Sequence, residues 1–406
     1  MRLSALLLAA AAVASAQQYD LLIKGGHVID PANSIDRVMD VAVTGNSIAR
    51  VAQSIDRSQA KKVIDATGYY VTPGLIDLHA HTFGYSGSIK PDDTHLPAGT
   101  TTVIDAGGPG YKTIDEFRKL VVNRSRTRVY ALINIAGGGM VGNDVESDVS
   151  DMLPDKTAAA IKANRDIVVG IKTAHFGRPG YAALERAVEA GKLANVPVMV
   201  DLGILSPSDR TTKGKLERLR PGDIATHMYN DRQLELVDRF RGRVQPWSIE
   251  ARKRGVIFDM GHGGGSFMWP VAAAATREGF YPDTISTDLH ASSIMGTKSD
   301  MPNCISKMVV LGMSLQEAIM RSTVTPAKAI SKFPEHGTLG EGKNADIAIL
   351  KKSEGVFPYF DAWLKKHLGN VKIESVLTVR DGKIVYDVDG LAFPEWTTAG
   401  DYTVIP

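Results

Sequence analysis

Two histidines separated by one residue, His79 and His81, are the first pair in the chain whose types and spacing could do chemistry. They end a short apolar run, and residues two apart on a strand share a face, so both rings can contact one ion. Ionisable side chains also close or follow five further apolar runs: Lys172, Asp201, His227, His262 and Asp288, with His290 two residues beyond. Imidazole and carboxylate groups gathered in one place are typical of a divalent-metal site that activates water.

The runs that carry these residues are the strands that must position them. Eight strand-like apolar runs alternate with helical segments through residues 71–333: 75–78, 102–105, 129–135, 167–171, 198–202, 224–228, 256–260 and 284–289. Amphipathic stretches such as 181–193 and 231–241 lie between several of them. Continuous apolar runs indicate strands buried on both faces, and their alternation with helices implies a parallel sheet. We therefore predict an α/β fold, a (β/α)8 TIM barrel, with an open doubly wound sheet as the alternative.

A polar residue at a strand end is often only a loop residue or a helix cap. In a barrel, however, the C-terminal ends of all strands meet at one mouth, where the active sites of this fold lie. Ionisable residues in the same register at six run ends are better explained by one shared site than by separate coincidences. The histidines outside that register are interpreted as structural or surface residues: His27, His95, His336 and His367.

The residue pattern at both ends of the chain differs from the pattern in the middle. Residues 19–70 and 334–391 contain short β runs separated by glycine-rich turns, and Asp381-Gly382 is typical of a two-residue hairpin turn. These segments predict one small β-sandwich domain built from both chain ends. Residues 392–406 are predicted to be a C-terminal tail.

Residues 1–16 have the plan of a signal peptide: a positive start, an apolar run and the small residues Ala-Ser-Ala. We expect cleavage there and export, to a periplasm or to the medium. The apolar run is shorter than the roughly 20 residues that span a bilayer, so a membrane anchor is not expected. Charges nearly balance, with 47 Lys and Arg against 45 Asp and Glu, which disfavours a nucleic-acid partner. The single cysteine, Cys304, excludes an internal disulfide and a cysteine-based metal site.

The residues around the run ends resemble the amidohydrolase superfamily. Residues 71–81, VTPGLIDLHAH, resemble the signature of this superfamily. Residues 340–346, GEGKNAD, resemble the segment where its members pass from the barrel back into the small β domain. Four further motifs are similar to a deacetylase-like, dihydroorotase-related branch that acts on small N-acyl or O-acyl molecules: GIK at 170–172, THMYN at 226–230, DMGHG at 259–263 and STDLH at 286–290. The resemblance covers nearly all of the chain after the signal peptide.

The resemblance implies two divalent metal ions. Zinc is the favoured metal, with manganese or iron as alternatives. His79, His81 and Asp288 would bind the more buried ion, and His227 would bind the other. Lys172 would bridge both ions after its amine adds carbon dioxide to become a carbamate. A homo-oligomer is also compatible with the resemblance.

Asp201 departs from the family pattern, because the fifth strand there usually ends in a histidine ligand. Aspartate can also ligate zinc through oxygen, so we include Asp201 in the metal set and expect a harder, more anionic second site. The alternative is a second ion that is weakly held or absent. His175, three residues after Lys172, is a less favoured substitute ligand.

These residues together predict hydrolysis of an amide or ester bond in a small acylated substrate. Asp288 would move the proton between the nucleophile and the leaving group, and His262 and His290 would bind the substrate. A cyclic-amide hydrolase of the dihydroorotase or hydantoinase kind is one alternative, and a non-catalytic secreted binding protein on a decayed scaffold is another. A deaminase is less favoured, because such enzymes in this superfamily usually use one metal and need no bridging lysine.

Overall fold

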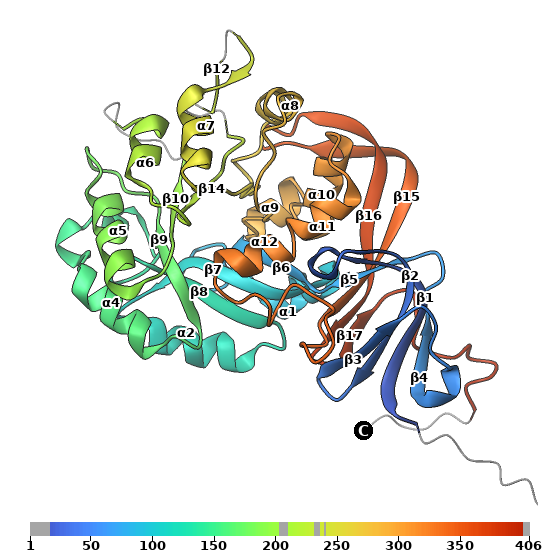
Figure 1. Ribbon diagram of the computed structural model, residues 1–406. Helices are drawn as coiled ribbons and strands as arrows, with labels where there is room; N and C mark the ends of the chain where they lie inside the picture. The colour runs from blue at the N-terminus through green and yellow to red at the C-terminus, as the bar shows by residue number, and fades with distance from the viewer. Residues whose placement is uncertain (1–16, 203–209, 231–235, 239–240, 401–406) are drawn as a thin grey trace, which may run out of the picture.

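The computed structural model describes residues 17–202, 210–230, 236–238 and 241–400, which form a barrel and a strand-rich domain (Figure 1). The barrel sheet has seven parallel strands in the order β14-β11-β10-β9-β8-β7-β6. Their bounds are β6 Leu75–Ala80, β7 Thr100–Gly110, β8 Arg128–Asn134, β9 Val168–Thr173, β10 Val198–Asp201, β11 Ile224–Thr226 and β14 Ile257–Phe258. Each lies within or overlaps a predicted run, because strands buried on both faces are apolar throughout.

Residues 284–289 occupy the eighth position without forming a regular strand. They make a parallel bridge to β6 through Leu289 and Ala80, and another to Asp259, just after β14, through Thr284. The segment is polar, and Asp288 has a left-handed φ of 48°, which interrupts strand geometry. These bridges close the barrel, so the open doubly wound alternative is wrong.

Helices cover the outside of the barrel (Figure 1). Their bounds are α1 Pro91–Thr94, α2 Ile114–Leu120, α3 Asn143–Glu146, α4 Pro154–Ala163, α5 Ala182–Ala194, α6 Thr212–Arg218, α7 Pro246–Lys253, α8 Trp269–Arg277, α9 Ala291–Gly296, α10 Met301–Val310, α11 Leu315–Met320 and α12 Val324–Ala329. No helix among the described residues is both long and apolar enough to span a bilayer.

The two amphipathic stretches have different outcomes. Helix α5 matches the first; it buries one face and ends at Ala194, and the N–H of the next residue, Asn195, caps its last turn. In the second stretch, Val237–Asp238 forms β12, which pairs with β13, Arg243–Val244, so this described part is not helical. Residues 231–235 and 239–240 lie outside the described residues.

The strand-rich domain takes its strands from both chain ends, as predicted. The strands are β1 Tyr19–Asp30, β2 Ile35–Thr44, β3 Ser47–Ala52, β4 Ala60–Asp65, β5 Tyr70–Pro73, β15 Ile347–Phe360, β16 Lys366–Arg380 and β17 Lys383–Asp387. The sheet order is β17-β16-β15-β5-β1-β2-β3, with β4 on β1, and β15 joins the N-terminal part by pairing with β5. Asp381 and Gly382 both have positive φ, 48° and 74°, as expected for the predicted hairpin turn.

One arginine ties the barrel to the strand-rich domain. Arg128, at the start of β8, donates to the carboxylate of Asp346 and, at 2.9 Å, to Asp381 Oδ1. Asp346 is buried, and its other nearby cation is Arg380, whose Nη1 lies 3.7 Å from Asp346 Oδ1. Removing one member of a buried ion pair leaves the other charge without adequate compensation.

Replacing Arg128 with methionine is therefore expected to lower the free energy of unfolding by about 3 kcal/mol. Denaturant titration followed by tryptophan fluorescence measures this change. Lys61→Met is the matched control, because the Lys61–Asp20 pair is exposed and such pairs contribute less than about 1 kcal/mol. Equal losses in the two variants would contradict the assignment.

Candidate active site

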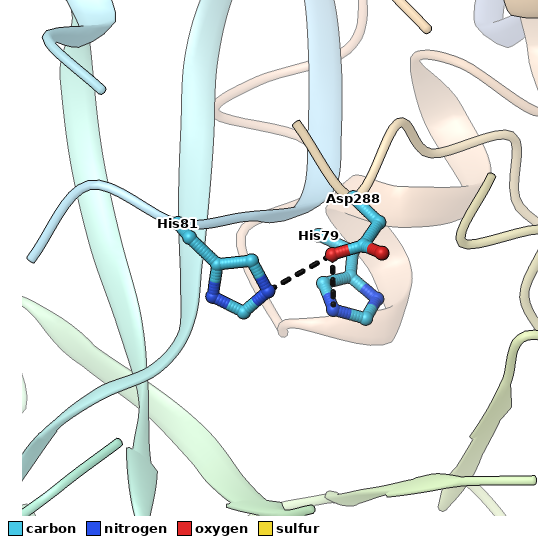
Figure 2. Close-up of side chains that lie close together, drawn as sticks. All are labelled: His79, His81 and Asp288. Atoms are coloured by element: carbon cyan, nitrogen blue, oxygen red, sulfur yellow. Dashed lines mark hydrogen bonds and ion pairs between the residues drawn. The ribbon is translucent and has the colours of Figure 1, made fainter. Parts of the chain in front are cut away.

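Three of the predicted residues meet at the mouth of the barrel. Figure 2 shows the carboxylate of Asp288 between the rings of His79 and His81. Its Oδ1 lies 2.9 Å from His81 Nε2 and 3.5 Å from His79 Nε2. All three residues are buried, and their ligand atoms lie within 4.8 Å of one another. Within the described part of the chain, no other group of three or more His, Cys, Asp or Glu residues is close enough to hold an ion.

Asp77 holds the two sides of this cluster together. It lies on β6 and is fully buried. Its Oδ1 accepts hydrogen bonds from the backbone N–H of His79, at 3.2 Å, and of Thr287, at 3.0 Å. Its Oδ2 lies 3.1 Å from His95 Nε2, and His95 is buried, so of the surface or structural positions predicted for it the structure shows the structural one. Asp77 therefore joins the first strand to the segment that carries Asp288.

A hydrogen-bond chain fixes the orientation of His79. The hydroxyl of Thr226 donates to Asp259 Oδ2 at 2.7 Å, so it accepts from His79 Nδ1, 2.9 Å away. The proton of the His79 ring is thereby placed on Nδ1, and the Nε2 lone pair faces the cluster. Burial, then the charge of Lys172, lowers the pKa of His79 to about 4, which keeps the ring neutral.

The residues of this cluster fit a divalent ion. Burial alone would raise the pKa of Asp288, but the neighbouring His79 and His81 hold it well below its usual range, so the carboxylate is ionised. Two imidazoles and one carboxylate form a donor set that zinc, manganese and iron accept. His79 and His81 both direct Nε2 toward Asp288, as ligands of one ion would.

The second half of the predicted metal set is arranged differently. Lys172 Nζ forms an ion pair with Asp201 Oδ1 at 2.8 Å and lies 3.0 Å from His79 Nε2. Burial alone would raise the pKa of Asp201, but Lys172 and His227 hold it below its usual range. His227 Nε2 lies 3.7 Å from the same Asp201 oxygen, and its Nδ1 donates to Gly261 O at 2.6 Å.

His175 does not join this group. Its Nδ1 lies 3.0 Å from the buried carboxylate of Glu146, and its ring stacks near Tyr85 with centroids 6.4 Å apart. Burial by itself lowers the pKa of His175, but Glu146 outweighs that effect and raises it. The residue is therefore a loop histidine at the mouth, as the sequence favoured, rather than a substitute ligand.

The two residues predicted to bind substrate, His290 and His262, have different environments in the structure. His290 Nδ1 donates to the carbonyl of Asp288 at 2.7 Å, which leaves Nε2 to accept from another group at the mouth. The geometry of His262 contradicts a substrate contact. Its ring is fully buried, Nε2 accepts from Lys307 at 2.6 Å, and Nδ1 donates to Gly263 O at 2.8 Å. Both nitrogens are thus used inside the protein, and His262 shapes the loop after β14.

Sequence reasoning missed the residues that support the cluster. Thr226 and Asp259 lie inside the sequence motifs described above. Their role in orienting His79 depends on the contact between β11 and the segment after β14, which the sequence does not show. Lys307 lies on α10, and nothing in its sequence surroundings marks it as the partner of His262. Tyr85 packs against two of the predicted site histidines, with ring centroids 4.8 Å from His81 and 5.6 Å from His290. An aromatic residue shortly after the His-x-His pair was the available signal.

A closed (β/α)8 barrel with a histidine–aspartate cluster at its mouth defines a metal-dependent hydrolase class. Residues 266–385 match the amidohydrolase family. A deacetylase of Enterococcus faecalis is 33% identical over 340 residues, which are 82% of this chain and 89% of that protein.

Two solved structures have the same fold. One is described as an adenine deaminase, with 32% identity and a TM-score of 0.83, and covers 91% of this chain and 100% of its own. The other, a dihydroorotase, has 25% identity and a TM-score of 0.80, and covers 90% and 99%. The chain therefore belongs to the amidohydrolase superfamily, among its deacetylase-like members.

Proposed function

We propose that this protein hydrolyses an amide or ester bond of a small acylated molecule, as a metal-dependent deacetylase. The buried cluster of His79, His81 and Asp288 is the observation that carries the proposal. The deacetylase of Enterococcus faecalis supports it, because the similarity extends over 82% of the chain. Neutral imidazoles beside an ionised carboxylate are what a hydrolytic ion requires.

An ion bound by this cluster supplies a Lewis acid and an acidified water molecule. Asp288 takes the proton of the attacking water and delivers it to the leaving nitrogen or oxygen, as general base and then general acid. Its placement between two histidines keeps it ionised before that transfer. His290 Nε2, with Nδ1 fixed on a backbone carbonyl, accepts from a polar group of the substrate.

Zinc is proposed as the resident ion, with manganese or iron as alternatives, and elemental analysis of the purified protein decides among them. Export is proposed from the signal-like residues 1–16, which lie outside the described residues. N-terminal sequencing of exported protein checks it, since cleavage after Ala16 gives a chain that begins at Gln17. Self-association into a homo-oligomer is proposed from the family resemblance and is measured by light scattering.

Two competing functions keep some support. The dihydroorotase structure favours a cyclic-amide hydrolase, and the adenine deaminase structure favours attack on a ring carbon that bears an amino group. A non-catalytic binding protein is not favoured, because the first cluster retains every ligand atom and the chain that orients His79.

A substrate screen with metal-loaded protein tests the function. We expect hydrolysis of N-acetyl or O-acetyl derivatives of amino or hydroxy acids, complete loss with a chelator, and recovery on adding zinc or manganese. Dihydroorotate, hydantoins and adenine are included as competing substrates. Turnover of one of these, with none of the acetylated compounds hydrolysed, would replace the deacetylase proposal.

A further inference from the structure

We propose that Tyr85 is a catalytic residue of this site, whose hydroxyl donates a hydrogen bond to the carbonyl oxygen of the acyl group under attack. The inference rests on the proposed function and deepens it, because it assigns a protein group to the reacting oxygen. Tyr85 belongs neither to the metal cluster nor to the substrate contacts expected from the sequence, which were His262 and His290.

The ring of Tyr85 lies across the mouth of the barrel. Its centroid is 5.6 Å from that of His290, which follows the eighth position of the barrel, and 6.4 Å from that of His175, which follows β9 at the fourth position. In a barrel of eight these two positions are on opposite sides, so a ring that contacts both lies between them. The same ring is 4.8 Å from that of His81, which places it beside the metal cluster.

Backbone contacts hold the segment that carries Tyr85. The preceding residue, Gly84, passes so close to β7 that a Cβ on it would lie 3.0 Å from the carbonyl oxygen of Gly108. On the other side, Ser88 donates to the carbonyl of Tyr85 from its N–H, at 3.0 Å, and from its hydroxyl, at 2.7 Å. The position of the ring is therefore fixed before substrate binds, as a group that stabilises a transition state requires.

The hydroxyl of Tyr85 is available to a ligand. The side chain is partly buried, yet no residue in the described part of the chain forms a hydrogen bond with its hydroxyl. The carboxylates of Asp288, Glu146 and Asp201 are all within electrostatic reach of it, so the hydroxyl faces the mouth. A phenolic hydroxyl is a hydrogen-bond donor at neutral pH.

Other polar side chains beside the cluster already have partners inside the protein. These contacts are Thr226 to Asp259, Lys172 to Asp201, and His227 and His290 to backbone carbonyls. The reacting carbonyl oxygen needs a donor, because negative charge develops on it as water attacks. Tyr85 supplies that donor without breaking an existing contact.

Tyr85→Phe should lower kcat about a hundredfold and leave KM within about twofold of its natural value, as expected for a donor that acts only in the transition state. Phenylalanine keeps the ring and its contacts with the three histidines, so metal content and melting temperature should not change. Steady-state kinetics with the best acetylated substrate from the screen, elemental analysis and thermal melting measure these effects on metal-loaded protein.

Binding of a transition-state analogue tests the same contact without turnover. The probe is the methylphosphonyl analogue of that substrate, in which a tetrahedral, anionic phosphorus group replaces the acetyl carbonyl. Calorimetric titration should show a Kd about a hundredfold higher for Tyr85→Phe than for the natural protein, in parallel with the loss in kcat/KM, because such analogues share the contacts of the transition state.

Tyr70→Phe is the matched control. Tyr70 lies on β5 of the strand-rich domain, with its ring 5.2 Å from that of His27. Its hydroxyl also has no hydrogen-bond partner among the residues that the structure describes. The control substitution should change neither the kinetics nor the binding of the phosphonyl analogue.

An unchanged kcat in folded, metal-loaded Tyr85→Phe would overturn the inference and leave the deacetylase function standing. A higher KM with unchanged kcat would also overturn it, because the hydroxyl would then bind a part of the substrate that does not change during the reaction. Loss of metal from this variant would make Tyr85 a support of the cluster instead of a substrate contact. If the natural protein hydrolyses none of the acetylated compounds, the proposed function fails, and the oxygen assigned to Tyr85 fails with it.

Discussion

His79→Ala is expected to lower kcat/KM about a thousandfold or more, because the ion contributes several kcal/mol of transition-state stabilisation. The variant loses one of three ligands and also the ring that Thr226 and Asp259 hold in place. The ion should be lost together with the activity. Metal analysis and steady-state kinetics on the same preparation measure both effects, and adding excess zinc should recover little of the rate.

His27→Ala is the matched control for this substitution. His27 lies on β1 of the strand-rich domain, where its Nε2 pairs with Asp36 at 2.7 Å, and it touches no residue of the cluster. Metal content and kinetics should both remain close to those of the natural protein. If hydrolysis persisted undiminished in His79→Ala, a metal mechanism at this site would be excluded.

The barrel could be predicted from the sequence because its strands are buried on both faces. A continuous apolar run such as Val129 to Ile133 is stable only where both faces of the strand are buried, as they are here. The eighth run was harder, since its polar residues turn toward the cluster and it makes only isolated bridges. The pairing of the two chain ends was predicted only from their similar pattern of short β runs and glycine-rich turns. The pairing itself joins β5 to β15, which lie far apart in the sequence.

The candidate site was predictable where residues share one strand and much less so where they meet across strands. His79 and His81 are two apart on one strand, so their common face followed from strand geometry. His262 fitted the same register, yet its ring turns into the protein because Lys307, on a distant helix, reaches it. The contact between Lys172 and Asp201 likewise depends on side-chain directions that spacing does not reveal.

The similarity to known structures also changes the comparison between candidate reactions. The sequence argument disfavoured a deaminase, yet a solved structure described as an adenine deaminase has the same fold and 32% identity with this chain. Deacetylation and deamination are both hydrolyses by an activated water, and they differ in the group that leaves. Near the metal cluster, Tyr85 packs against the rings of His175 and His290. Adenine therefore belongs in the substrate screen as a full competitor.

Gly263→Ala is expected to displace Asp288, one of the three proposed metal ligands. A Cβ at this position would lie 2.0 Å from Asp288 Oδ2, and the backbone φ of +51° is unfavourable for alanine. The carboxylate would have to move away from the histidines to make room. Since displaced supporting groups typically cost 10- to 100-fold in metal affinity or activity, we expect a loss of about a hundredfold in both.

Gly264→Ala separates this effect from a general disturbance of the loop. Gly264 is the next residue, has no positive φ, and a Cβ there would meet nothing closer than 3.8 Å. Metal affinity and melting temperature should therefore stay close to those of the natural protein. Equal loss of metal from both variants would mean that loop conformation, rather than contact with Asp288, controls the ion. A loss confined to Gly263→Ala would show that the first metal position depends on the close approach of this backbone to its carboxylate ligand.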